Sequence, residues 1–272
     1  MERRVYMKGL LIDLDGTIYH GKSIISGADL LIQELRRQGI PYLYVTNNAS
    51  RTPASVAEHL RSLGIEADAH EVCTSALASA EYIASEISDG KVYCIGEAGL
   101  REALADKGLL LVEDEQADIV VQGIDRSFTY DKLAGAVSQI LGGARFVMTN
   151  PDLLLPTDSG FIPGAGSIGA SIQAATSVQP IIIGKPSGIL MDYALDRMGI
   201  QADEALVIGD NMRTDIAAGV AAGCRTALVL TGVTTRENMD THLKETGLQA
   251  DWIFDSLADL RIWIEQNIGK ER

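Results

Sequence analysis

Two aspartates follow an apolar run close to the amino terminus. The run 9–12 leads directly into Asp13, and Asp15 comes two positions later, before Gly16 and Thr17. An apolar run that ends in turn residues predicts a buried strand of a parallel sheet. Because side chains alternate along an extended chain, both carboxylates are able to point toward one place. Neighbouring buried carboxylates are costly, so the pair predicts a divalent cation, unless the aspartates only cap the strand or hold a structural ion.

Polar residues also follow the next predicted strand, 41–46. Thr46, Asn47 and Asn48 place a hydroxyl, amide side chains and exposed main-chain N–H groups at the strand end. Such groups suit a bound phosphate, although a turn that caps the next helix accounts for the same residue types. Lys185 follows a later apolar strand and offers a compact positive charge to a phosphoryl group, or is an ordinary solvated lysine.

Two further aspartates belong to the segment after the predicted strand 205–208. Asp210 stands at the strand end, and Asp215 falls in the first turn of a helix expected over 213–222, where the helix dipole favours an anion. The alternative is a capping residue with a first-turn acid. In an open parallel sheet, ligands bind at the carboxyl ends of the strands, so these groups are predicted to converge on one site.

The elements that position these residues alternate between strand-like and helix-like segments, which indicates an α/β protein with a doubly wound parallel sheet. The chain between Thr46 and Lys185 is far longer than one helical crossover needs. We therefore expect an inserted α/β domain over 80–178 and a core domain formed by 1–79 and 179–272.

Two segments carry specific expectations within this arrangement. Residues 180–183 predict a strand that resumes the first α/β alternation. Residues 150–163 contain three prolines and several polar turn clusters, which predicts a long irregular segment. Asn150, Asp152 and Asp158 in that segment are candidate contacts to a substrate.

Composition narrows the class of partner and the compartment. The chain has 272 residues, is 46% hydrophobic and carries a net charge of −14, which argues against nucleic acid or anionic membranes as partners. The three cysteines are far apart in the sequence, so neither a disulfide nor a thiolate metal site is expected. The four histidines have no metal-ligand spacing. No signal-like apolar run follows the early arginines, so a cytoplasmic location is predicted, with Met7 as an alternative start.

A glycine pattern at 164–169 matches the dinucleotide-binding pattern G-x-G-x-x-G but lacks its context. A dinucleotide site needs a buried strand directly before the glycines and an acidic residue about 20 positions later. The preceding residues are short and broken by proline, and Lys185 stands where the acid is needed. We therefore expect these glycines to permit close packing or a turn, and a nucleotide-cofactor oxidoreductase is disfavoured.

Four motifs together resemble those of the haloacid dehalogenase (HAD) superfamily. DLDGT at 13–17 resembles its first motif, TNNASRTP at 46–53 its second, GKP at 184–186 its third and GDNMRTD at 209–215 its fourth. The second motif is similar to that of the NagD-like, p-nitrophenyl phosphatase-like branch. The resemblance implies a Rossmann-like core, an α/β cap domain inserted between the second and third motifs, and a Mg²⁺-dependent phosphatase.

The resemblance also implies roles for individual residues. Asp13 would attack phosphorus and form an aspartyl-phosphate, and Asp15 would act as general acid and then as general base. Mg²⁺ would bind Asp13, Asp15 through its main-chain carbonyl, and Asp210, while Asp215 would hold a metal-bound water or the loop. The phosphate-binding residues would be Thr46, Asn47, Asn48 and Lys185.

The substrate class that follows is a small phosphorylated metabolite. Sugar phosphates, nucleoside monophosphates, phosphoglycolate and pyridoxal phosphate are all within reach of this branch, with p-nitrophenyl phosphate as an artificial substrate. A phosphotransferase or mutase on the same site, and a non-catalytic phosphometabolite-binding protein, remain alternatives. Caps of this kind often dimerise, but no exposed apolar stripe in the sequence requires a homodimer, so the oligomeric state is open.

Overall fold

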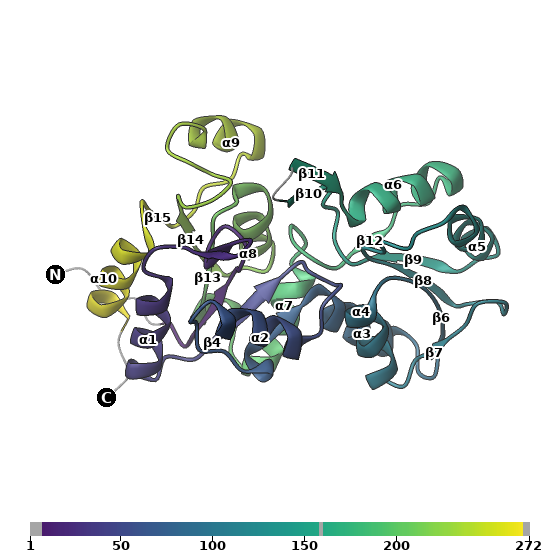
Figure 1. The fold of residues 1–272 in the computed structure, drawn as a ribbon, viewed down its shortest axis with the longest axis horizontal. Coiled ribbons are helices and arrows are strands. Elements are labelled where there is room, and N and C mark those ends of the chain that lie inside the picture. The colour runs from purple at the N-terminus through teal and green to yellow at the C-terminus, as the bar shows by residue number, and fades with distance from the viewer. Residues whose placement is uncertain (1–6, 158–159, 269–272) are drawn as a thin grey trace. The chain divides into compact units, whose positions relative to one another are not determined.

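The computed structural model describes residues 7–157 and 160–268, and Figure 1 shows their helices and strands. Contacts within the chain divide it into two compact units. The first unit comprises the described parts of 1–46, 56–73 and 186–272, and the second comprises those of 47–55 and 74–185. The chain therefore leaves the first unit after Thr46, re-enters it for 56–73, leaves it again and returns after Lys185. The domain boundaries at 79/80 and 178/179 stay predictions.

The first unit is built on a six-stranded sheet with the order β15-β14-β13-β1-β4-β5. The pairs β1/β13, β1/β4, β13/β14 and β14/β15 are parallel. The strands of this sheet are β1 (Gly9–Ile12), β4 (Tyr42–Thr46), β5 (Val72–Thr74), β13 (Ala205–Gly209), β14 (Arg225–Val229) and β15 (Trp252–Phe254). A short antiparallel hairpin joins β2 (Tyr19–His20) to β3 (Ser23–Ile24).

The central strand β1 is buried along its whole length, which is why its sequence is a continuous apolar run. Ile12 pairs in register with Ile208 of β13 and with Tyr44 of β4. The three strands therefore end at one edge of the sheet, and the residues that follow β1 and β13 emerge beside each other. This register, fixed by apolar residues alone, positions the polar residues of the site.

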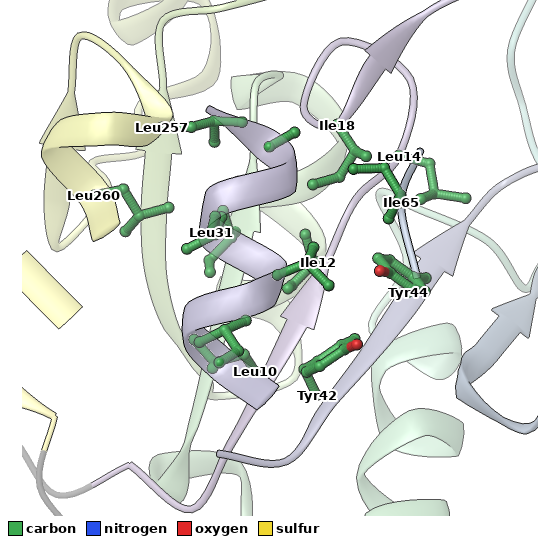
Figure 2. Packing of buried hydrophobic residues seen from close by; sticks show 14 of the residues in the cluster. Leu10, Ile12, Leu14, Ile18, Leu31, Tyr42, Tyr44, Ile65, Leu257 and Leu260 are labelled. Atoms are coloured by element: carbon green, nitrogen blue, oxygen red, sulfur yellow. The ribbon is translucent and has the colours of Figure 1, made fainter. Parts of the chain in front are cut away.

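Helices cover this sheet. They are α1 (Ala28–Gln38), α2 (Pro53–Ser62), α7 (Ile189–Met198), α8 (Ala217–Ala221), α9 (Met239–Thr246) and α10 (Leu257–Asn267), with short turns η1 (Ala69–Glu71), η2 (Ala202–Glu204) and η3 (Met212–Ile216). The apolar residues of α1 recur at helical spacing, and the helix ends at Gly39, whose φ of 63° is left-handed. Figure 2 shows Leu31 of α1 among Leu10 and Ile12 of β1 and Leu257 of α10, all in one buried cluster.

The second unit has its own five-stranded parallel sheet, with the order β12-β9-β8-β6-β7. Its strands are β6 (Lys91–Ile95), β7 (Leu110–Leu111), β8 (Ile119–Gln122), β9 (Arg145–Met148) and β12 (Ile181–Ile182). Its helices are α3 (Ser75–Glu86), α4 (Ala98–Asp106), α5 (Tyr130–Leu141) and α6 (Ala165–Thr176). Side chains of α5 and α6 pack with those of β8 and β9 in a separate apolar core.

Strand β12 corrects one expectation from the sequence. Residues 180–183 were expected to resume the first sheet, but Ile181 and Ile182 pair with Val147 and Met148 of β9 in the second sheet. An apolar strand carries no signal of which sheet it joins, because both sheets are built from apolar strands. The partner is decided by the geometry of the segments on both sides.

The segment 150–163 corrects another expectation. Instead of an irregular stretch, it contains the antiparallel hairpin of β10 (Leu154–Thr157) and β11 (Gly160–Pro163). A two-stranded ribbon leaves one edge of each strand unpaired, so it tolerates prolines that a central strand would not. Asp158, a predicted substrate contact, lies outside the described residues.

The α/β fold class, with parallel sheets and an inserted second α/β unit, is confirmed. Among the described helices, none has the length and apolar character needed to cross a membrane.

The packing of α1 predicts a difference between two adjacent leucines. Leu31 is 0% exposed and Leu30 is 51% exposed, although both stand on the same helix. Leu31→Ala leaves a cavity between β1 and α10 and is expected to lower the free energy of unfolding by about 2–5 kcal/mol. Leu30→Ala is the matched control and is expected to change it by about 0.5 kcal/mol or less. Urea unfolding measures both, and equal losses would contradict this packing.

Candidate active site

Three aspartates meet at the carboxyl edge of the first sheet. Asp13 follows β1 and its N–H donates to the carbonyl of Ile208 at 2.9 Å, which extends the pairing with β13. Asp210 follows β13, and Asp215 lies five residues later. These residues are only 8%, 1% and 1% exposed, respectively. The sequence predicted that these positions converge, and the structure brings them together.

The three carboxylates offer a set of ligands for a cation. One oxygen from each of Asp13, Asp210 and Asp215 lies within 4.8 Å of the others, among the described residues. Buried charges of one sign are strongly destabilising unless something compensates them. Oxygen ligands at this spacing suit Mg²⁺, a hard cation that prefers carboxylates and water. The donor set therefore fits the predicted metal, and the Asp215 carboxylate lies within the same cluster.

The turn η3 brings Asp215 back to the strand end. The helix expected over 213–222 is instead one π-type turn at Met212–Ile216 followed by the short helix α8. The Asn211 side chain accepts the N–H of Arg213 at 2.9 Å, and the Asn211 N–H donates to Oδ2 of Asp215 at 3.0 Å. Wide turns of this kind are frequent at functional sites. Here the turn fixes the Asp215 carboxylate next to β13.

Thr17 is a site residue that the sequence analysis did not single out. Its Oγ1 lies 3.3 Å from Oδ2 of Asp13 and 3.2 Å from Oδ1 of Asp210, and the residue is completely buried. The hydroxyl has one proton, so it donates to one of the two carboxylates at a time. Its place in the same turn as Asp13 and Asp15 was the signal that could have identified it.

The loop after β14 also supports the site and was not predicted. The N–H of Val233 donates to Oδ2 of Asp210 at 2.6 Å, and the N–H of Thr234 donates to its carbonyl at 3.0 Å. Thr231 Oγ1 donates to the carbonyl of Gly16 at 2.8 Å. Because β14 lies beside β13, its carboxyl end reaches the same edge, and this topology could have indicated the loop.

Gly16 allows the first loop to approach Asp210 closely. Its φ is 94°, and a Cβ built there would lie 2.5 Å from Oδ2 of Asp210. Asp15, just before it, is exposed and lies outside the cluster of three carboxylates. The structure thus separates the two aspartates of the first motif, one buried among other acids and one open to solvent.

The predicted phosphate-binding residues fall in both units. Thr46 ends β4 in the first unit and is buried. The Asn48 side-chain oxygen accepts the N–H and hydroxyl of Ser50 and the N–H of Arg51, so it shapes its own turn.

In the second unit, Asn47 and Lys185 contact each other. The Asn47 side chain hydrogen-bonds the main chain of Lys185, which is only 3% exposed. Asn150 and Asp152, the predicted substrate contacts, both hydrogen-bond Asn47. In the structure, the side-chain contacts of Asn150 and Asp152 with Asn47 are therefore within the protein.

The three cysteines are buried thiols. All three cysteines are free and buried, which agrees with the expected absence of disulfides. Burial raises the pKa of Cys73 to about 11 and the pKa values of Cys94 and Cys224 to about 12. Each group therefore lacks the thiolate fraction that a nucleophile needs at neutral pH.

The glycines at 164–169 serve packing, as predicted. They open α6, which follows the antiparallel hairpin β10–β11 and not a parallel strand. A Cβ on Gly166 would lie 2.1 Å from the carbonyl of Pro151, and the Gly166 N–H donates to the carbonyl of Asp152 at 2.9 Å. The helix start therefore holds the loop that carries Asp152.

Comparison with known proteins decides the family. Residues 10–110 match a family model described as haloacid dehalogenase-like hydrolase, and residues 182–260 match a second, HAD-hydrolase-like model. The chain is 47% identical over 238 residues to the 5'-nucleotidase YutF of Bacillus subtilis, covering 88% of this chain and 93% of the relative. The chain belongs to the haloacid dehalogenase-like hydrolase family. The predicted membership in its NagD-like branch is confirmed.

Other members of this hydrolase family extend over nearly the whole chain. An acid sugar phosphatase of Staphylococcus haemolyticus is 44% identical over 263 residues, covering 97% of this chain and 98% of the relative. The solved p-nitrophenyl phosphatase of Archaeoglobus fulgidus has a TM-score of 0.89 at 38% identity, covering 94% of this chain and 99% of its own. The glycerol phosphate phosphatase Rv1692 of Mycobacterium tuberculosis, solved in complex with magnesium, has a TM-score of 0.87 at 36% identity, covering 96% and 78%. The prediction of a HAD-type phosphoric monoester hydrolase is confirmed.

The place of Thr17 between two carboxylates predicts a difference between two conservative variants. Thr17→Val keeps the shape but removes the hydroxyl, so it is expected to lower kcat/KM for p-nitrophenyl phosphate about 10- to 100-fold, in line with the loss of a hydrogen bond to a charged group. Thr17→Ser keeps the hydroxyl and is expected to stay within about threefold of the parent protein. Similar kinetics for the two variants would show that the hydroxyl has no role.

Proposed function

We propose that this hydrolase removes the phosphoryl group from small phosphorylated metabolites, using Mg²⁺ and an aspartyl-phosphate intermediate. The observation that carries the proposal is the buried cluster of Asp13, Asp210 and Asp215, with the exposed Asp15 two residues after the first of them. A cluster of this kind is costly to fold and is maintained where a cation and a phosphoryl group use it.

Asp13 is the proposed nucleophile. One of its carboxylate oxygens forms a bond to phosphorus while the bond between phosphorus and the leaving oxygen breaks. Asp15 donates a proton to that leaving oxygen, then takes a proton from the water that attacks the aspartyl-phosphate. The second attack breaks the bond between Asp13 and phosphorus and releases inorganic phosphate. The exposure of Asp15 supports this role, because the group must exchange a proton in each turnover.

The cation would be held by Asp13, Asp210 and the main-chain carbonyl of Asp15, with Asp215 keeping the loop or a bound water in place. The hydrogen bond from Asn211 to Asp215 supports this division, since it ties that carboxylate to the loop. When bound, Mg²⁺ neutralises the crowded carboxylates and polarises the phosphoryl oxygens. The magnesium complex of the related glycerol phosphate phosphatase also favours this ion.

The phosphoryl oxygens are bound, in this proposal, by the hydroxyl of Thr46, by main-chain N–H groups of the Asn47–Asn48 turn and by the ammonium group of Lys185. Thr46, Asn47 and Asn48 lie within the first family-model match and Lys185 within the second, which supports the assignment. The burial of Lys185 supports it too, because a buried ammonium group needs anionic or polar partners.

The substrate class is argued from the relatives. Their names describe a 5'-nucleotidase, acid sugar phosphatases and p-nitrophenyl phosphatases, so we propose a sugar phosphate or a nucleoside monophosphate as substrate. Phosphoryl transfer to a sugar in place of water uses the same residues. Product analysis with and without an acceptor alcohol separates hydrolysis from transfer. We further propose that the protein works in the cytoplasm, where its free cysteines stay reduced.

Replacement of the proposed nucleophile tests the mechanism. Asp13→Asn is expected to lower kcat for p-nitrophenyl phosphate by about 1,000-fold or more, because the amide cannot form the intermediate. Without metal, the same variant is expected to unfold at a higher temperature than the parent, since one of three repelling carboxylates is gone. Asp106→Asn makes the same chemical change at an exposed site and is expected to keep full activity. An active Asp13→Asn protein would rule out the nucleophile.

Removal of the metal tests the cofactor. Treatment with a chelator is expected to abolish phosphate release, and added Mg²⁺ is expected to restore it. Because Mg²⁺ binds only the folded protein, it is also expected to raise the Tm of the parent protein by mass action. Asp210→Asn is expected to weaken or remove this rise in Tm. Activity that survives the chelator, together with a Tm that ignores Mg²⁺, would contradict the proposal.

A further inference from the structure

The Asn47 side chain pairs with the main chain of Lys185 in both directions. Asn47 Nδ2 donates to the Lys185 carbonyl at 3.0 Å, and the Lys185 N–H donates to Asn47 Oδ1 at 2.8 Å. An amide side chain that pairs in this way acts like a neighbouring strand, fixing both the position and the direction of the peptide. The contact joins positions 138 apart in sequence, both within the second unit.

The hydrogen-bonding capacity of this side chain is already used. A side-chain amide has two N–H donors, and Nδ2 of Asn47 gives one to Lys185 and the other to Oδ2 of Asp152 at 3.1 Å. The opposite orientation of the amide would place two donors against the Lys185 N–H and leave the Lys185 carbonyl and Asp152 with an acceptor. One orientation alone satisfies all three partners, and it leaves no donor for a phosphoryl oxygen.

Asn47 is itself held by two other side chains. Its main-chain carbonyl accepts the hydroxyl of Ser75 at 2.7 Å and Nδ2 of Asn150 at 2.9 Å. Ser75 stands at the start of α3, and Asn150 belongs to the same loop as Asp152. Asn47 is therefore a rigid support, because its backbone and its side chain are both fixed.

Gly184 makes room for this contact. A Cβ at Gly184 would lie 2.5 Å from Oδ1 of Asn47 and 2.5 Å from the carbonyl of Thr149. An alanine there would push the Asn47 amide away from the Lys185 N–H. The contact between Asn47 and Lys185 therefore requires a glycine at position 184.

We propose that Asn47 is a positioning residue for Lys185 and that its side chain does not touch the phosphoryl group. It fixes the Lys185 peptide, and this limits the volume that the long, flexible lysine side chain explores. A lysine gains little from a phosphate contact if it must first give up its conformational freedom, so a fixed backbone raises its effect. This inference rests on the proposed function of Lys185, and it separates the two residues that the family motifs group together.

A double-mutant cycle tests the route by which Asn47 acts. Asn47→Ala, Lys185→Met and the double variant are compared by kcat/KM for p-nitrophenyl phosphate and by the inhibition constant of inorganic phosphate. In the parent background, Asn47→Ala is expected to lower kcat/KM and to raise the inhibition constant of inorganic phosphate, each by about tenfold or more. This is the size expected for two lost hydrogen bonds. In the Lys185→Met background, the same change is expected to cost about twofold or less, because the residue it positions is gone.

If Asn47→Ala changes the two constants by the same factor in both backgrounds, the amide contacts the phosphoryl group directly. If it leaves both constants unchanged in the parent protein, the amide has no role. Either result overturns the proposal. Gly184→Ala disturbs the same contact from the other side and is expected to show the same dependence on Lys185, which covers a failure of Asn47→Ala to fold. Gln116→Ala removes an amide that hydrogen-bonds two main-chain carbonyls elsewhere in this unit and is expected to leave both constants within about twofold.

Hydrogen exchange separates a failure of this inference from a failure of the proposed function. The Lys185 N–H is expected to exchange slowly in the parent protein and much faster in Asn47→Ala, whether or not the protein hydrolyses any phosphate ester. Unchanged exchange would overturn the contact itself. If the Lys185 N–H exchanges faster in Asn47→Ala but the protein releases no phosphate from any ester, the contact is supported and only its role in catalysis is refuted.

Discussion

The main physical constraint on the first unit is the burial of three aspartate side chains at one edge of its sheet. Asp13, Asp210 and Asp215 lie within reach of a single cation, and each is almost completely enclosed. Such a cluster opposes folding, since each charge loses water and gains two repelling neighbours. The apolar strands on which these residues stand must therefore supply enough stability to hold them in place.

Main-chain groups contribute to compensating this charge. N–H groups of two separate loops, at Asn211 and Val233, donate to the carboxylates of Asp215 and Asp210. Thr17 adds one hydroxyl between Asp13 and Asp210. These donors reduce the cost of the negative charge without neutralising it, which leaves the site suited to a divalent cation. Main-chain donors also impose little restriction on sequence, so their role is hard to see in a list of residues.

In the second unit, Lys185 is positioned in a different way. Lys185 is placed by hydrogen bonds between an amide side chain and its peptide, and not by an apolar strand alone. The glycines that open α6 hold the loop of Asp152, and Asp152 in turn orients Asn47. A pattern that looks like a nucleotide site in the sequence is thus part of the support for a proposed phosphate-binding lysine. Asn150 and Asp152 connect this loop to Asn47 through hydrogen bonds.

The sequence alone determined the α/β class, the inserted second unit and the convergence of Asp13, Asp210 and Asp215, because apolar runs that end in polar turns encode the carboxyl ends of buried parallel strands. Four short motifs at those strand ends indicated the family. Only the tertiary structure decided that β12 joins the second sheet, that residues 154–163 form a hairpin, and that Thr17 and the loop after β14 contact the carboxylates. It also decided that the Asn47 amide is used by Lys185 and Asp152. For the β12 strand and the contacts of Thr17, the loop after β14 and Asn47, the physical reason is that partners far apart in the chain are chosen by spatial proximity, which residue type and spacing do not record. The hairpin is local, and its prolines and polar residues gave the same pattern as an irregular segment.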